Sequence, residues 1–177
     1  MAAKESVVCV DIDGNTNEVA IDDISFRPSV YGVIVKNGSI LLTPQFTDQW
    51  DFPGGGMDLG ETLDEALERE IREETGMGAK RDKLLHVDTD FFTHPGTKKS
   101  YQTVHMYFTC TDVSGEISTD GFDEHEKSYA RMAEWIPIEK ALTLKYCNSV
   151  DSPSLIRLAA SGAGISADAV GPSSRRA

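Results

Sequence analysis

The sequence predicts a single α+β domain in which a few helices pack on a β-sheet. Three observations support this prediction: β-rich runs lie before and after one long amphipathic segment, that segment carries helix start and stop signals, and two short helical segments follow the last strand. Strands, then a helix, then strands and helices are the order expected of a mixed α/β or α+β fold. A chain of 177 residues is long enough for one such domain with a full core.

Residues 1–25 are expected to form an N-terminal β-hairpin extension packed on this domain. Residues 6–21 predict two short strands joined by an Asp-Gly turn at Asp13-Gly14. An alternative is a partial resemblance of Val7–Gly14 to the start of haloacid-dehalogenase-type phosphatases, in which Asp11 would be a nucleophile. Asn15 stands where that pattern usually has Thr or Val, so the hairpin is favoured. Thr16 occupies the glycine position of an EF-hand loop, which argues against a calcium site.

Residues 26–160 are expected to form the main domain. An Asn-Gly signal at Asn37-Gly38 predicts a hairpin between its first two strands. The predicted strands are residues 30–35, 39–43, 84–92, 101–110 and 131–136, and the predicted short helices are residues 138–142 and a segment starting at Ser152-Pro153. Residues 161–177 are rich in Gly, Ala and Ser without apolar periodicity, so we expect a disordered tail.

The longest predicted helix begins after Thr62 and ends at Gly76. Thr62 and Glu65 have the spacing of a capping box, and Gly76 is a typical residue for the position that follows a helix. At about 100° per residue, one side of this helix is apolar and should pack on the domain. That side carries Leu63, Ala66, Leu67 and Ile71, whereas Glu65, Glu68 and Arg72 lie opposite.

Three further carboxylates border the apolar side of this helix. Glu70 and Glu74 project along the same stripe as Leu67, and Glu73 lies beside them. Like charges at these spacings repel, and partial burial adds a desolvation cost, so a positive group should compensate. One interpretation is a salt-bridge network with Arg69 and Arg72, but neither arginine projects along the stripe. We therefore favour a divalent cation, Mg²⁺ or alternatively Mn²⁺, both of which prefer oxygen ligands.

Charge and cysteine content limit the functional classes. The formal net charge is −12, from 17 basic and 29 acidic residues, which argues against sequence-independent nucleic-acid binding and against RNA decapping. A polyanionic substrate would need a metal to offset repulsion by so acidic a chain. The three cysteines are odd in number and widely spaced, as expected of reduced thiols. No secretory or membrane-spanning segment is evident, so we expect a cytoplasmic protein.

The stretch from Gly55 to Met77 resembles the Nudix box, the signature of hydrolases that act on a nucleoside diphosphate linked to another moiety. Every fixed position of the pattern is filled, and the preceding Phe52-Pro53-Gly54 is also similar. The resemblance implies an α/β/α sandwich around a mixed β-sheet. It also implies a Mg²⁺-dependent nucleotide diphosphohydrolase, or pyrophosphatase, in which water attacks phosphorus.

The resemblance assigns roles to individual residues. Glu70, Glu73 and Glu74 would bind the metal, with the Gly54 carbonyl as a further ligand and Glu61 nearby, and Arg69 would orient the carboxylates. The catalytic base would be a helix glutamate such as Glu73 or an acidic residue of a later loop. In that loop, residues 120–126, the candidates are Glu124 and Glu126.

Substrate identity is less well determined by the sequence. Arg27, Lys98 and Lys99 could contact phosphates, and we expect a small nucleotide as partner, no nucleic acid, no membrane, and a homodimer as an open alternative. Two other functions are weighed: a non-catalytic nucleotide-sensing Nudix module and an isoprenoid-diphosphate isomerase. The complete glutamate set argues against the first, and the lack of a cysteine in a defensible catalytic position argues against the second.

Overall fold

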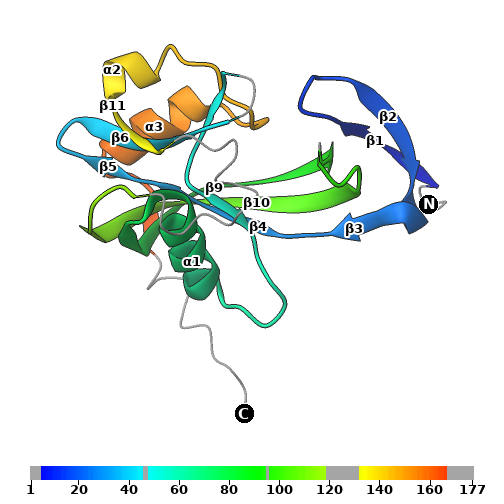
Figure 1. The fold of residues 1–177 in the computed structure, drawn as a ribbon, viewed down its shortest axis with the longest axis horizontal. Helices are drawn as coiled ribbons and strands as arrows, with labels where there is room; N and C mark the ends of the chain where they lie inside the picture. Colours follow the sequence, from blue (N-terminus) through cyan, green and yellow to red (C-terminus); the bar gives the residue numbers. More distant parts are fainter. Residues whose placement is uncertain (1–4, 46–47, 95, 119–131, 167–177) are drawn as a thin grey trace.

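A computed structural model of the protein describes residues 5–45, 48–94, 96–118 and 132–166 (Figure 1). The first strands are β1 (Ser6–Val10), β2 (Thr16–Ala20), β3 (Ile24–Phe26), β4 (Ser29–Val33), β5 (Val35–Lys36), β6 (Ser39–Pro44), β7 (Trp50–Asp51) and β8 (Gly54–Gly56), with a 3₁₀ turn η1 (Ile21–Asp23). The later elements are α1 (Leu63–Thr75), β9 (Gly78–Thr93), β10 (Ser100–Ser114), β11 (Glu134–Pro137), α2 (Ile138–Ala141), α3 (Ser152–Ala160) and β12 (Ile165–Ser166).

A mixed sheet is built around the long antiparallel pair β9 and β10. Its strand order in the described part of the chain is β2-β1-β9-β10-β4-β8, with β12 also on β9 and β3 also on β10. Strand β4 runs parallel to β10 and antiparallel to β8, so the glycine strand β8 lies at the edge of this sheet. A smaller sheet has the order β11-β6-β5, with β7 beside β6.

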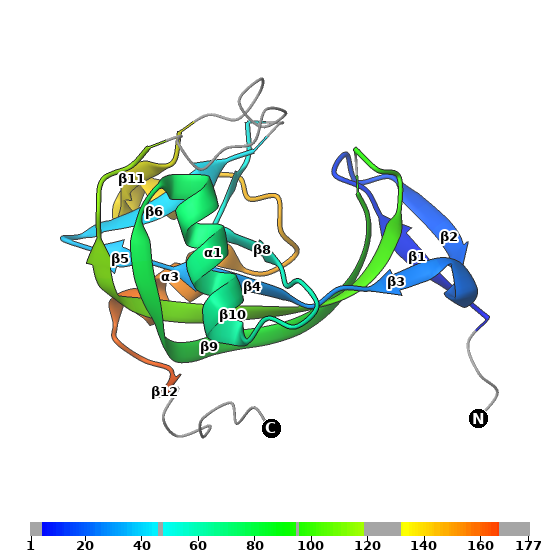
Figure 2. The ribbon, with the colours of Figure 1, turned by 60° about the horizontal axis from the view of Figure 1, so that its bottom comes forward.

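Helices cover the main sheet on both faces, with α1 on one side and α3 on the other (Figures 1 and 2). Ala66, Leu67 and Ile71 of α1 pack into one core cluster, and Leu155 and Ile156 of α3 pack into a second. Burying apolar surface on both faces is the main favourable term for such a three-layer arrangement. The predicted α+β fold is confirmed.

The predicted capping box of α1 is present. The Thr62 hydroxyl accepts a hydrogen bond from the Glu65 backbone N–H, and the Glu65 carboxylate accepts one from the Thr62 N–H. The helix ends at Gly76, whose φ of 72° suits a residue without a Cβ. These local signals fix where α1 begins and ends, and thereby which way its acidic residues project.

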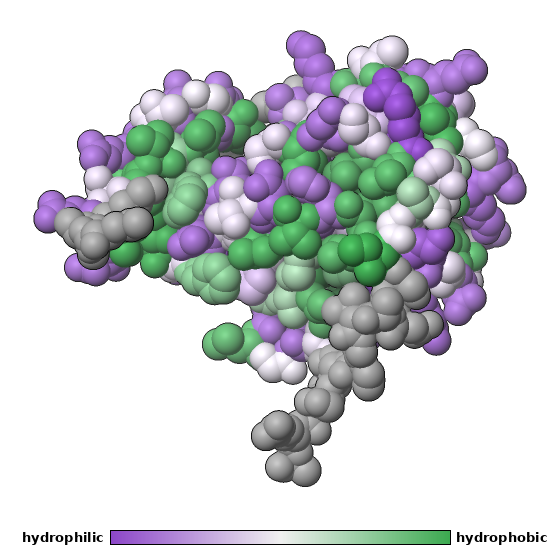
Figure 3. All heavy atoms as spheres, turned by 180° about the vertical axis from the view of Figure 1, so that it is seen from behind, coloured by the Kyte–Doolittle hydropathy of each residue, from purple (hydrophilic) through white to green (hydrophobic). Residues whose placement is uncertain are grey.

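The N-terminal strands extend the main sheet beyond the part that α1 covers. Strand β1 pairs with β2 along its length and with β9 at Val10 and Phe92, while β3 pairs with residues 100–102 of β10. Figure 2 shows the far ends of β9 and β10 curving away from α1 towards these strands. Apolar surface is visible at this end of the molecule in Figure 3, and Val8 and Phe26 are among its exposed side chains.

Several element limits differ from the sequence prediction: the strand expected at residues 30–35 is divided into β4 and β5, β10 continues to Ser114, and β11 begins at Glu134. Strand β9 begins at Gly78 instead of residue 84, because the charged run Lys80–Lys83 conceals the alternation of a strand that pairs with β10. The tail was expected to be irregular from residue 161, but β12 pairs with residues 83–84 of β9. Residues 167–177 lie outside the described part. In that described part, no helix is long and apolar enough to cross a membrane.

Candidate active site

Strand β8 brings three glycines against both the helix α1 and the side chain of Arg27. Gly54, Gly55 and Gly56 lie opposite Tyr31, Val30 and Ser29 of β4. A Cβ on Gly55 would lie 2.8 Å from the Glu70 carboxylate, and a Cβ on Gly56 would overlap the guanidinium of Arg27. Since successive residues of a strand point to opposite faces, the glycines allow Glu70 to approach from one face and Arg27 from the other.

Arg69 joins the acidic residues of this region. Its Nε and Nη2 donate to Glu61 at 2.6 and 2.9 Å, and its Nη1 donates to Glu70 and Glu73 at 2.9 and 3.1 Å. Its Nη2 also donates to the Gly56 carbonyl at 3.1 Å. The hydrogen bonds from Arg69 lower the pKa of Glu61 to about 2.

The arginine contacts correct one expectation from the helical projection. We expected neither arginine to reach the carboxylate stripe, but Arg69 pairs with both Glu70 and Glu73. The projection gives the direction of the Cα–Cβ bond only, and a long guanidinium side chain can extend from it onto a neighbouring stripe. Arg72, by contrast, is exposed.

The three carboxylates of this helix differ in their surroundings. The Glu70 side chain is 12% exposed, and burial raises its pKa while Arg69 opposes that rise. Glu74 accepts a hydrogen bond from the Gly54 N–H at 3.1 Å, which ties the end of α1 to β8. The Glu73 side chain is 46% exposed. The three carboxylates therefore lie at one rim, where Glu70 has less access to solvent than Glu73 and Glu74 is held by the glycine strand.

The donor chemistry of this rim fits a hard divalent cation. It offers the carboxylate oxygens of Glu70, Glu73 and Glu74 beside a strand of glycines, where no Cβ blocks approach. Among the described residues, no three His, Cys, Asp or Glu side chains converge into a metal-binding group. Instead Glu70 and Glu73 turn towards Arg69, and Glu74 turns towards Gly54.

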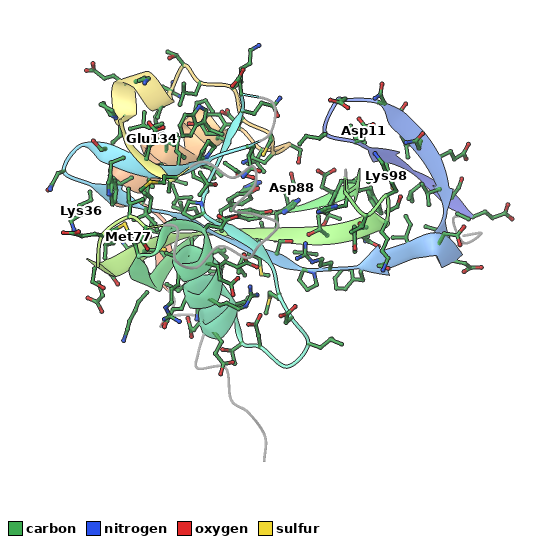
Figure 4. The ribbon with its side chains drawn as sticks, in the orientation of Figure 1. Asp11, Lys36, Met77, Asp88, Lys98 and Glu134 are labelled. Carbon is green, nitrogen blue, oxygen red and sulfur yellow. The ribbon has the colours of Figure 1, made fainter. Side chains whose placement is uncertain are left out.

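The predicted phosphate contacts lie in two different places. Arg27 lies over Gly56, and its charge lowers the pKa of His94 in addition to the effect of burial. Lys98 and Lys99 lie on the turn between β9 and β10, and Figure 4 shows Lys98 at the hairpin end, near Asp11. Only Arg27 of the three is brought to the acidic rim. Glu124 and Glu126 lie outside the described residues.

A cavity of about 490 Å³, here called the hairpin pocket, adjoins the rim and was missed by sequence reasoning. Several segments far apart in the chain enclose it. Its lining comprises Val10, Asp11, Ile12, Asp13 and Gly14 of the hairpin, Asp90, Phe92, Thr93 and His105 of β9 and β10, and Tyr31, Gln49, Asp51, Cys147, Asn148 and Ser149. Tyr31 is also the register partner of Gly54, so pocket and rim share an edge.

Asp51 is the most buried carboxylate of the hairpin pocket. Its Oδ1 accepts from the Phe52 N–H at 2.8 Å and from Asn148 Nδ2 at 2.6 Å, and its Oδ2 accepts from the Cys147 thiol at 3.1 Å. Burial raises its pKa to about 6. The one sequence signal for this residue was its place between Trp50 and Phe52, since a charge inside an apolar run needs buried partners.

Comparisons with known proteins agree with this architecture. The NUDIX domain family matches residues 25–158. The nucleoside triphosphatase NudI of Enterobacter sp. (strain 638) is 32% identical over 129 residues, covering 67% of this chain and 86% of that protein. The RNA pyrophosphohydrolase of Edwardsiella ictaluri (strain 93-146) is 41% identical over 68 residues, and this match spans 37% of the chain and 38% of that relative.

A solved structure of low sequence identity has the same fold. The solved structure of the MutT protein from Methanosarcina mazei Go1 has a TM-score of 0.59 and 19% identity, covering 79% of this chain and 96% of that one. Fold and site together define a hydrolase whose acidic helix faces a glycine strand. The chain belongs to the Nudix hydrolase family, and the resemblance noted from residues 55–77 is confirmed.

Proposed function

We propose that the protein is a Mg²⁺-dependent hydrolase that cleaves a diphosphate bond in a small nucleotide by attack of water at phosphorus. The observation that carries this proposal is the acidic rim, where Arg69 holds Glu70 and Glu73 beside the glycine strand that contacts Glu74. The substrate class is a nucleoside triphosphate or a nucleoside diphosphate linked to another moiety. The relative named nucleoside triphosphatase NudI favours this class.

Glu70, Glu73 and Glu74 would hold the cation, with Mn²⁺ as the alternative to Mg²⁺. When bound, such an ion neutralises phosphate charge and makes water a better nucleophile. The acidic balance of the chain makes this neutralisation necessary, because the protein would otherwise repel a polyphosphate. Glycines at 54–56 let the phosphate groups approach the backbone closely.

The remaining roles, which are substrate binding, proton acceptance and positioning, would belong to side chains of the protein. Arg27, positioned over Gly56, would bind a phosphate of the substrate and thereby place the scissile bond at the rim. Glu73 has the most exposed side chain among the carboxylates that Arg69 contacts, so it is the described residue best placed to accept a proton from water. Arg69 would keep Glu70 and Glu73 in position throughout.

A screen of the purified protein tests this function. The panel contains nucleoside triphosphates, ADP-ribose, dinucleoside polyphosphates, nucleotide sugars and a 5′-triphosphorylated RNA, each with and without Mg²⁺ or Mn²⁺. Metal-dependent release of phosphate or pyrophosphate from a small nucleotide is the expected result. Preference for the RNA would favour the activity named for the Edwardsiella ictaluri relative. No turnover on any substrate would favour a nucleotide-sensing module.

The metal can also be tested without turnover. A ligand that binds the folded protein alone raises its melting temperature by mass action. Millimolar Mg²⁺ or Mn²⁺ should therefore raise the melting temperature of the wild-type protein, and the rise should shrink in a Glu70→Gln variant. An equal rise in both proteins would show that the ion binds at a site that does not include Glu70.

A further inference from the structure

The hairpin pocket has one wall that the family match does not include. Val10 to Gly14, at the turn between β1 and β2, line the cavity, whereas the NUDIX domain match begins at residue 25. Asp11 fixes the shape of this turn, because its carboxylate accepts from the backbone N–H groups of Asp13 and Asn15. The N-terminal extension thus presents a shaped loop to a cavity that opens beside the acidic rim.

The lining of the hairpin pocket selects against anions. It contains the carboxylates of Asp11, Asp13, Asp51 and Asp90 and no Lys or Arg among its described members. A phosphate or carboxylate group placed there would meet acceptors and like charge. A neutral group that carries N–H donors would be matched, and Phe92 and Tyr31 offer aromatic faces for a flat ring.

Two polar atoms of the lining have no hydrogen-bond partner among the described residues. They are Nδ1 of His105, whose side chain is buried with a residue exposure of 8%, and the buried Oε1 of Gln49. Buried polar groups are nearly always hydrogen-bonded, so two orphaned atoms around one cavity point to a bound molecule that satisfies them. The volume of about 490 Å³ is within the usual range for small-molecule sites, about 300 to 1,000 Å³.

The carboxylates of the pocket differ in how far they are already used. Asp51 accepts three hydrogen bonds from protein groups, and Asp11 holds the turn. Asp90 accepts one, from the Phe91 N–H. Asp13 is exposed at the tip of the turn, and no hydrogen bond or ion pair of its carboxylate is found in the described part of the chain. Asp13 is therefore the lining carboxylate with the greatest remaining capacity to accept.

We propose that the hairpin pocket receives the nucleobase of the substrate, that it favours bases with an exocyclic amine, and that the N-terminal hairpin takes part in this selection through Asp13. The inference rests on the proposed function, because the shared edge at Tyr31 and Gly54 places the pocket next to the diphosphate-cleaving rim. His105 and Gln49 supply the deep contacts, and Asp13 closes over the ligand from the hairpin side.

Binding of nucleoside monophosphates without metal tests the pocket separately from catalysis. Calorimetry should give tighter binding of CMP than of UMP and of AMP than of IMP. In each pair a carbonyl oxygen, which the acceptors of the pocket repel, replaces the exocyclic amine, and the neighbouring ring nitrogen gains a hydrogen. Asp13→Ala should weaken binding of CMP and AMP about tenfold, as loss of one charge-assisted hydrogen bond predicts. It should leave UMP and IMP nearly unchanged. Asp22→Ala removes an exposed carboxylate of the same segment outside the pocket and should change none of the four.

A second variant distinguishes a ligand contact from a purely structural histidine. If His105 binds the base, His105→Phe should weaken binding of all four monophosphates. If its Nδ1 is merely an unsatisfied buried atom, the substitution should raise the melting temperature and leave binding unchanged, which would overturn the role of His105.

The two proposals fail in different ways. Equal binding of amine-bearing and amine-free bases, or an Asp13→Ala variant that binds as the wild type does, would overturn the selection by the hairpin even if the enzyme hydrolyses nucleotides. Amine-dependent binding that Asp13→Ala weakens, without hydrolysis of any substrate in the screen, would support the pocket and overturn the proposed reaction.

Discussion

Arg69 and Glu61 form a bidentate ion pair, with Nε–Oε1 and Nη2–Oε2 distances of 2.6 and 2.9 Å. Glu61 is in turn anchored by the Asp58 N–H at 2.8 Å, so the loop before α1 is tied to the middle of the helix. This geometry fixes the guanidinium plane and leaves its Nη1 to contact Glu70 and Glu73. The arginine therefore positions two carboxylates from one rigid support.

An Arg69→Lys substitution should lower kcat/KM about 10- to 100-fold, the usual cost of losing a residue that orients metal-binding side chains. A lysine keeps the charge but cannot form the two parallel bonds to Glu61 while also meeting Glu70 and Glu73. Steady-state kinetics in saturating Mg²⁺ measure the loss. Arg72→Lys, on the exposed side of the same helix, is the control and should retain activity. Equal activity of both variants would contradict the positioning role.

Glu73→Gln and Glu74→Gln should each keep the fold and lose most activity, at least about 100-fold if Glu73 also acts as base. An isosteric amide fits in place of either side chain while losing the charge that a cation requires. Circular dichroism checks the fold, and phosphate release checks the activity. Glu68→Gln, a neighbouring carboxylate outside the rim, should behave as the wild type does. Full activity of either rim variant would remove that residue from the site.

Sequence reasoning succeeded where the determinants were local. The limits of α1 follow from Thr62 with Glu65 and from Gly76, all within the helix or next to it, and the apolar stripe follows from helical periodicity. The stripe also identified Glu70 as partly buried beside the core. Arg69 was misjudged because rotation around several side-chain bonds is invisible in a helical projection.

Features made by distant segments could not be predicted in the same way. The hairpin pocket includes residues 10–14, 49–51 and 147–149, and the pairing of β1 with β9 and of β3 with β10 brings the first of these segments to the others. His105 looked like one more residue of an alternating strand, and its lack of a partner depends on the three-dimensional surroundings. Arg27 was chosen for its charge, whereas its position over Gly56 depends on how β4 pairs with β8.

A Gly55→Ala substitution should reduce activity without unfolding the protein. Gly55 is not among the residues with positive φ, so alanine can adopt its backbone conformation. The new methyl group would lie 2.8 Å from the Glu70 carboxylate, which can move because it is the end of a flexible side chain. Displacing Glu70 should weaken metal binding and raise the Mg²⁺ concentration needed for half-maximal activity. Gly96→Ala, on the exposed turn after β9, is the control, and an identical Mg²⁺ requirement in both would contradict the contact.

Asp51→Asn should change the pH dependence of stability. Burial raises the pKa of Asp51 to about 6 from an ordinary value of 3.8, so the folded protein binds this proton more tightly than the unfolded chain does. The resulting stabilisation is fully present below about pH 4 and is lost as the pH rises through about 6. The difference corresponds to about 3 kcal/mol of unfolding free energy.

Asparagine can keep the acceptor for Phe52 and Asn148 but carries no charge at any pH. The unfolding free energy of the variant minus that of the wild type should therefore be larger at pH 7.5 than at pH 4. The increase should approach about 3 kcal/mol. Urea denaturation at both pH values measures this margin, and Asp22→Asn, which removes an exposed carboxylate, is the control. A difference between variant and wild type that is the same at pH 4 and pH 7.5 would show that Asp51 does not titrate in this range.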